Sequence, residues 1–204
     1  MFVVTVDQKA SRTRGDAVPA LLEAVAAWRE RQPADPFVLP VERTVGDEVQ
    51  GVLSDARAVV GLALLLQRLG GWSVGIGAGA VVEPLAASAP ASSGEAFIHA
   101  RTAVERARGR AVSVPLAVDG ASPAAAEEAE ALLQLLAAVV RRRSDAGWEV
   151  VDLLEELGTQ RAVAERLGIS AQAVSQRLDA ALWQEEARLH PLAARLLTTA
   201  GEAA

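Results

Sequence analysis

Residues 42–53, ERTVGDEVQGVL, place two adjacent acids directly after a lone glycine within a pattern of alternating apolar and polar residues. Such alternation is typical of β-strands and Gly46 marks a turn, so we predict a strand–turn–strand hairpin over residues 37–53. Asp47 and Glu48 then lie near the hairpin tip. Three interpretations are open: they belong to the metal end of a nucleotide site, to the remnant of such a site, or to the polar tip of a hairpin.

Outward from the hairpin, the flanking segments alternate between strand and helix patterns. Residues 2–6, FVVTV, form an apolar, β-branched run that ends at Asp7 and predicts a buried strand. Helical spacing of apolar residues predicts a helix over 16–31, and an acidic cap with a closing glycine pair predicts another over 55–71. The next strand begins with WSVGIGAGAV at residue 72, and its glycines predict close approach of backbone or ligand.

The rest of the chain changes character near residue 119. A small-residue loop (83–94), a helix (95–110) and a strand (111–118) complete the order β-α-β-β-α-β-α-β, which describes an α/β sandwich over residues 1–118. Residues 119–126, DGASPAAA, have the composition of a linker. We predict that residues 127–204 form an all-α domain, so that the fold class is α+β. Its helices are expected at 127–143, 147–157, 159–167, 170–179 and 181–199.

Composition limits the class of protein. With 204 residues, 51% hydrophobic and 23% charged, the chain is globular, and it has no cysteine for disulfides or thiolate metal sites. It has no uncharged apolar run of about 18 residues and no signal-peptide pattern, so we expect a cytoplasmic protein without membrane contact. The net charge of −6 argues against non-specific nucleic-acid binding over the whole surface, but it allows a local basic patch.

The most specific pattern is TQRAVAERLGISAQAVSQRLDA, residues 159–180. Ala164 is small where a second helix must cross, Gly168 follows four residues later, and Ile169 comes next. Val174 and Leu178 then give the second helix a buried face. This joint spacing of small, glycine and apolar residues is the pattern of a helix-turn-helix.

The second helix of this motif would present a polar face to DNA. Glutamine can pair bidentately with adenine in the major groove, and serine can contact bases or phosphates. Arginines make the segment locally basic, which predicts a small electrostatic footprint. The residues predicted to contact double-stranded DNA are Arg161, Gln172, Ser175, Gln176 and Arg177.

The acids of the first strand and of the hairpin could share a metal ion. Neighbouring strands lie about 4.8 Å apart, so Asp7 and Asp47 can be adjacent and can bind Mg²⁺. Glu48 is the weaker ligand, because alternation along the hairpin points it away from Asp47. A loop with cations that opens a helix suits phosphates, so the predicted nucleotide contacts are Lys9, Arg12 and Arg14.

These segments also resemble known families. RTVGDEVQGVL, WSVGIGAG and ARTAVERARGRAVSV are similar to the GGDEF-type diguanylate cyclase domain and the wider nucleotidyl cyclase and palm group. That resemblance implies a ferredoxin-like, cyclase-like sandwich and maps the metal-binding acids onto Asp7 and Asp47. Val45 replaces the first signature glycine and Val49 the phenylalanine, so guanine selectivity is not implied.

Over nearly its full length, with GDEVQ in front and GISAQAVSQRL behind, the chain resembles the SatD family of bacterial proteins, which join such a region to a C-terminal helix-turn-helix.

We therefore expect a DNA-binding transcriptional regulator whose N-terminal domain senses a nucleotide or supplies dimer contacts. The alternative is a Mg²⁺-dependent nucleotidyl transferase or cyclase that carries a DNA-binding module. A third interpretation makes the N-terminal domain a scaffold without a ligand. The last helix, over residues 181–199, could either cover the helix-turn-helix core or pair with a second subunit in a homodimer.

Overall fold

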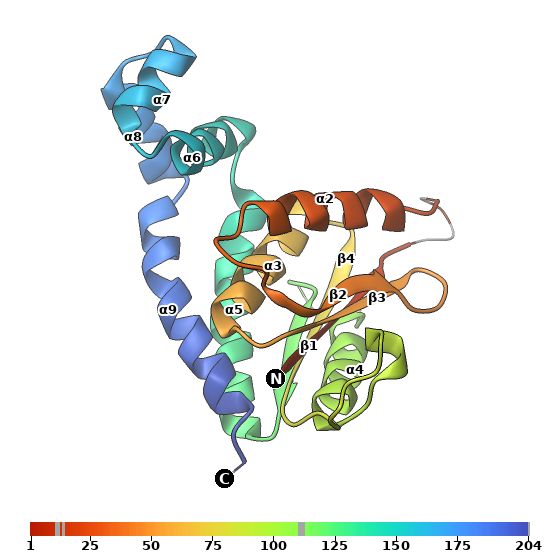
Figure 1. Ribbon diagram of the computed structural model, residues 1–204. Coiled ribbons are helices and arrows are strands. Elements are labelled where there is room, and N and C mark those ends of the chain that lie inside the picture. Colours follow the sequence, from red (N-terminus) through yellow and green to blue (C-terminus); the bar gives the residue numbers. More distant parts are fainter. Residues whose placement is uncertain (11–12, 14, 110–112, 204) are drawn as a thin grey trace.

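Figure 1 shows the computed structural model of the chain, which describes residues 1–10, 13, 15–109 and 113–203. A five-stranded mixed sheet lies at its centre in the order β2-β3-β1-β4-β5. β1 pairs antiparallel with β3 and β4, β2 pairs antiparallel with β3, and β5 runs parallel to β4. The predicted α+β class is confirmed at this level. The strands are β1 (Phe2–Gln8), β2 (Phe37–Arg43), β3 (Glu48–Leu53), β4 (Trp72–Ala78) and β5 (Leu116–Gly120).

Helices cover both faces of the sheet. One face carries α2 (Val18–Glu30), α3 (Ala56–Leu69), α5 (Pro123–Arg142) and α9 (Trp183–Ala200), whose buried residues share one core with β1. The other face carries α4 (Glu95–Ala107) and the short 3₁₀ helix η1 (Ala89–Ala91). The remaining helices project from the far end of α5 and α9 (Figure 1). They are α6 (Asp145–Leu157), α7 (Gln160–Leu167) and α8 (Ala171–Ala180).

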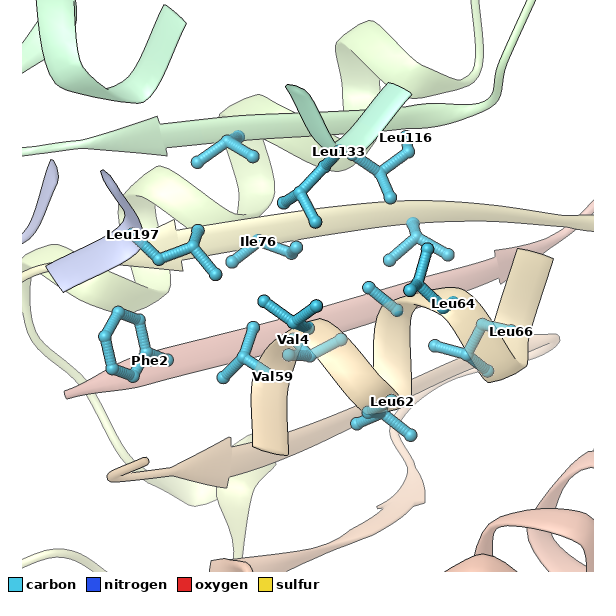
Figure 2. Close-up of a cluster of buried hydrophobic side chains, with 14 of the residues drawn as sticks. Phe2, Val4, Val59, Leu62, Leu64, Leu66, Ile76, Leu116, Leu133 and Leu197 are labelled. Atoms are coloured by element: carbon cyan, nitrogen blue, oxygen red, sulfur yellow. The ribbon is translucent and has the colours of Figure 1, made fainter. Parts of the chain in front are cut away.

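Alternation along β1 builds both cores. Phe2, Val4 and Val6 point into the main core, whereas Val3 joins the smaller core under α4. Figure 2 shows Leu197 of α9 and other leucines of α3, α5 and β5 meeting Val4 and Ile76 over the sheet. Burying one such side chain stabilises the fold by about 1.5–3 kcal/mol, so this cluster is the main source of stability of the body.

The glycines of β4 let α4 approach the sheet. A Cβ on Gly75 would lie 2.3 Å from the backbone nitrogen of Val104, and one on Gly77 would lie 2.1 Å from the carbonyl oxygen of Ala96. Both distances are impossible for real atoms, so only glycine fits. The close approach predicted at these glycines is therefore made by the backbone of α4.

The predicted division into two domains needs correction. Of residues 119–126, predicted as a linker, only Ala121 and Ser122 lie outside β5 and α5. Both α5 and α9, predicted to belong to the separate helical domain, contribute buried residues to the main core over the sheet. A further core, separate from the two cores on the sheet, is confined to α6–α8 and the start of α9. The α/β body therefore includes α5 and α9, and only α6–α8, here called the helical unit, form a core of their own.

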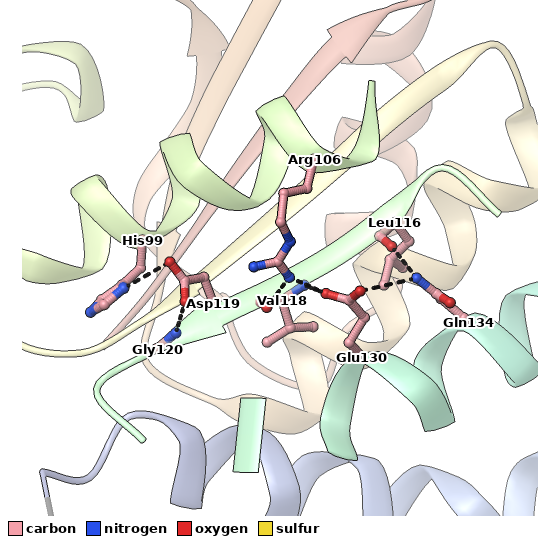
Figure 3. A network of polar contacts seen from close by, with 8 residues as sticks. All are labelled: His99, Arg106, Leu116, Val118, Asp119, Gly120, Glu130 and Gln134. Carbon is pink, nitrogen blue, oxygen red and sulfur yellow. Dashed lines mark hydrogen bonds and ion pairs between the residues drawn. The ribbon is translucent and has the colours of Figure 1, made fainter. Parts of the chain in front are cut away.

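Side chains cover the outer edge of β5 (Figure 3). The Val118 N–H donates to Glu130 at 2.8 Å, and the Val118 carbonyl accepts from Arg106 at 2.7 Å. Gln134 donates to the carbonyl of Leu116 at 2.9 Å. An edge strand with free N–H and C=O groups can pair with another chain, so this network from α4 and α5 shields β5 from such pairing.

The helix α9 runs through Pro191 without ending there, although proline in a helix interior favours a kink or a break. Its buried residues Ala193, Ala194 and Leu197 face the body, so its apolar side is used within the chain. None of the helices in the described ranges combines the length and the apolar character that crossing a membrane requires.

Candidate functional site

Three polar side chains form a row across the sheet near the end of β1. Asp7 lies opposite Glu48 of β3 and opposite Ser73 of β4. Side chains of directly opposed residues share one face, and here that face is the one covered by α4. The Ser73 hydroxyl is fully buried and has no hydrogen-bond partner among the described residues. The row therefore places two acids beside an unsatisfied hydroxyl.

Arg108, which follows the last turn of α4, neutralises both acids. Its guanidinium donates to Asp7 and, at 3.3 Å, to Glu48. The Thr44 hydroxyl donates to the other oxygen of Glu48 at 3.0 Å. Arg108 was not among the predicted site residues, since it lies 101 positions from Asp7 in the sequence. Its place at a helix C-terminus, where cations are favoured, was the signal that could have suggested it.

The electrostatic environment of Asp7 is unfavourable for its charge. Burial raises the pKa of this carboxyl above its ordinary value of 3.8, and the nearby charges of Asp47 and Glu48 raise it further, whereas Arg108 opposes the shift. Three carboxylates therefore lie close enough to influence one another, with one guanidinium between two of them. A further cation would find a favourable potential here.

Glu48, predicted to be the weaker ligand, is the hairpin acid that lies opposite Asp7 in the strand register. Asp47 precedes β3, so strand alternation does not decide its direction, and its charge also raises the pKa of Asp7. Asp47 lies in the turn before β3, where its backbone carbonyl accepts from the Gln8 N–H at 3.3 Å. Within the described ranges, no group of three or more histidine, aspartate or glutamate side chains is arranged to hold a metal ion. Any Mg²⁺ here would need its remaining ligands from water or phosphate.

Of the predicted phosphate contacts, only Lys9 lies in the described part of the chain; Arg12 and Arg14 lie outside it. The Lys9 N–H donates to the carbonyl of Gly71 at 2.8 Å, which fixes the start of this loop. Burial, together with the nearby charge of Arg141, lowers the pKa of the Lys9 amino group from 10.5. The positive charges of Lys9 and Arg141 are therefore close enough to influence each other.

The turn between α7 and α8 has the local geometry that its sequence predicts. The Thr159 hydroxyl accepts from the Ala162 N–H, and the Ser170 hydroxyl accepts from the Ala173 N–H, so both helices are capped. Gly168 ends α7 with φ 65° and ψ 31°, in the left-handed region. Ala164, Val174 and Leu178, which the pattern predicts to be buried, form the core of the helical unit together with Val163.

The predicted DNA-contact residues differ in their surroundings. Gln172 and Gln176 are exposed on α8, and Ser175 is half-buried. Arg177 donates to Glu149 of α6 at 2.8 Å, and Arg161 donates to Glu165 at 3.1 Å. The basic footprint expected from the sequence is therefore largely neutralised within the helical unit. Such exposed pairs are weak, about 0–1 kcal/mol each, so phosphates could displace their acids.

No protein-family model matches this chain, and neither a curated protein nor a solved structure is significantly similar to it.

Proposed function

We propose that the chain is a bacterial, cytoplasmic DNA-binding regulator in which α7 and α8 form a helix-turn-helix and α8 enters the major groove. The observation that carries this proposal is the capped, left-handed turn at Gly168 beneath an exposed polar helix. Gln172 and Gln176 lie one turn apart on α8, a spacing that lets both reach successive base edges. The acidic balance of the chain favours weak, salt-sensitive binding, which a homodimer would strengthen.

We also propose a ferredoxin-like, cyclase-like arrangement for the body. Strand order β2-β3-β1-β4 with antiparallel neighbours, and α2 and α3 on one face, supports it. The helix α4 connects β4 to β5, which pairs parallel with β4 and extends this sheet by one strand. Membership of the SatD family remains a prediction from sequence.

Substitution of both glutamines tests the DNA proposal. A preferred duplex is selected from random sequences with the full chain, and its affinity for Gln172→Ala/Gln176→Ala is measured by fluorescence anisotropy at fixed salt. Each lost bidentate base contact should cost about 1–3 kcal/mol and relax base preference at that position. The matched control is Gln184→Ala, an exposed glutamine on α9. Equal affinity of the double variant and the wild type would show that this face does not read DNA.

A second candidate function is Mg²⁺-dependent nucleotide binding at Asp7 with Asp47 or Glu48. It is favoured by Asp7 and Glu48 lying opposite each other on one face of the sheet, by the nearby charge of Asp47 and by the unsatisfied Ser73 hydroxyl. Mg²⁺ is commonly bound through one or two carboxylates and substrate phosphates, so this small set would suffice. Arg108 would then have to leave the acids, and with Lys9 it could contact the phosphates.

Thermal shifts with ATP, GTP and cyclic dinucleotides, each with and without Mg²⁺, test this candidate. A ligand at about 100 times its dissociation constant stabilises the fold by about 2.7 kcal/mol. We expect the Mg²⁺-dependent shift to disappear in Asp7→Asn and to remain in Asp35→Asn, an exposed acid elsewhere. A shift that persists in Asp7→Asn would locate the nucleotide at another place.

A further inference from the structure

A groove of about 1090 Å³ lies between the α/β body and the helical unit. Its walls come from α2, α3, the end of α5, α6 and the start of α9, so it follows the junction of the two cores. Sites for small organic molecules occur preferentially at such junctions, in clefts of about 300–1,000 Å³. The groove is thus large enough for a small organic ligand.

The walls combine apolar and aromatic side chains with charged ones. Three of the four tryptophans of the chain line it: Trp28 of α2, Trp148 of α6 and Trp183 of α9. Leucines of α3 continue the apolar wall, and Leu69 at its end is 43% exposed. Large apolar side chains gathered around a concave surface, rather than scattered singly, mark a binding surface.

The arginines that line the groove are mostly engaged already. Arg68 pairs with Asp152 through two hydrogen bonds of 2.6 Å. Arg143, with only 1% of its side chain exposed, pairs with Glu186. Both guanidinium groups also stack on the Trp148 ring, with Cζ at 3.7 Å and 4.3 Å from its centre. The groove therefore already binds cations of its own chain by aromatic and carboxylate contacts together.

The remaining charge is acidic. Four acids line the groove against three arginines, and Glu155 lies within 4 Å of no cation in the described part of the chain. The Glu155 side chain is exposed, but the protein atoms around its carboxyl raise its pKa by burial. The charge of Asp152 raises this pKa further, whereas the charges of Arg31 and Arg68 lower it. Arg31 is the one lining arginine outside these ion pairs among the described residues. A cationic guest would stabilise the Glu155 carboxylate, whereas an anionic guest would add to the one excess negative charge of the lining.

We propose that this groove binds an amphipathic organic cation, whose apolar part lies against the tryptophans and leucines and whose positive charge lies beside Glu155. The same chemistry that holds Arg68 and Arg143 on Trp148 would hold the guest. The proposal does not depend on DNA binding by α8.

A pair of probes with the same shape and opposite charge tests both parts of the proposal. Tetraphenylphosphonium and tetraphenylborate are titrated against the full chain, with tryptophan fluorescence and calorimetry as readouts. We expect the cation to bind and to change the fluorescence of the wild type and of Trp72→Phe, which lies outside the groove. Trp183→Phe should give a smaller fluorescence change. Binding of the anion should be at least about tenfold weaker, because like charges oppose it.

Charge variants then locate the site. Glu155→Gln should weaken binding of the phosphonium cation about fivefold to tenfold, whereas Glu128→Gln, an exposed acid of α5 outside the groove, should not change it. Arg31→Gln should strengthen binding, because it removes an opposing charge. The proposal is overturned if the anion binds as tightly as the cation, if neither probe binds, or if Glu155→Gln and Glu128→Gln behave alike.

Discussion

At the scale of single residues, Arg108 determines the electrostatics at the end of β1. A guanidinium delivers one positive charge through fixed donors, whereas Mg²⁺ delivers two charges and requires near-octahedral oxygen ligands. Asp7 and Glu48 keep only 15% and 20% of their side chains exposed, so water cannot fully replace Arg108 as their partner. Arg108 thus holds the pair of acids in the absence of any other cation, and a metal ion bound between Asp7 and Glu48 would displace it.

Residues whose role is local could be predicted from the sequence, and residues whose role depends on distant contacts could not. Thr159, Gly168 and Ser170 act on neighbours within four positions, so the spacing of the pattern reveals their caps and turn. Asp7 was also identified as an acid at a strand end. Asp7 lies opposite Glu48 because of the register between β1 and β3. A shift of this register by one residue would place a different residue opposite Asp7, and the sequence pattern does not fix the register.

At the scale of elements, the order of strands and helices follows from local periodicity, but the division into domains does not. The alanine-rich segment at residues 119–126 has a linker composition, yet small residues also allow close packing of helices. A Cβ on Gly120 would lie 2.3 Å from the carbonyl oxygen of Ala200, so the end of α9 packs directly on the end of β5. Ala125 and Ala126 are buried in the main core. Composition cannot distinguish a flexible small-residue segment from a tightly packed one.

The side-chain hydrogen bonds to the outer edge of β5 lead to a prediction for Glu130. Glu130→Ala leaves the buried N–H of Val118 without its partner, which should lower the free energy of unfolding by about 1–3 kcal/mol. Glu130→Gln keeps an acceptor oxygen, and the half-exposed ion pair with Arg106 contributes little, so this control should lose less than about 1 kcal/mol. Urea denaturation of the two variants measures the difference. Equal midpoints would mean that the N–H finds another partner.

At the scale of the whole molecule, a buried ion pair between the end of α5 and the start of α9 lies where the body meets the helical unit. Arg143 ends α5, stacks on Trp148 of α6, and donates to the Ala181 carbonyl at 3.0 Å between α8 and α9. Its carboxylate partner, Glu186, also contacts His190 at 3.0 Å. The charge of Glu186 therefore holds Arg143 where it contacts Trp148 and Ala181, beside the separate link from Arg68 of α3 to Asp152 of α6.

This arrangement predicts how stability depends on pH. Burial disfavours the charge of Glu186, but the hydrogen bonds from His190 and Arg143 outweigh it and lower its pKa below the ordinary 4.5. Because the folded pKa lies below the unfolded one, Glu186 stabilises the fold above about pH 4.5, and this stabilisation is lost as the pH falls through the folded pKa.

At neutral pH, Glu186→Gln leaves Arg143 buried without its counter-charge and should cost about 3–5 kcal/mol. Denaturation followed between about pH 7 and about pH 3 should show the wild type converging on Glu186→Gln in acid. A difference between the two proteins that stays constant over this range would mean that the Glu186 charge does not support the junction.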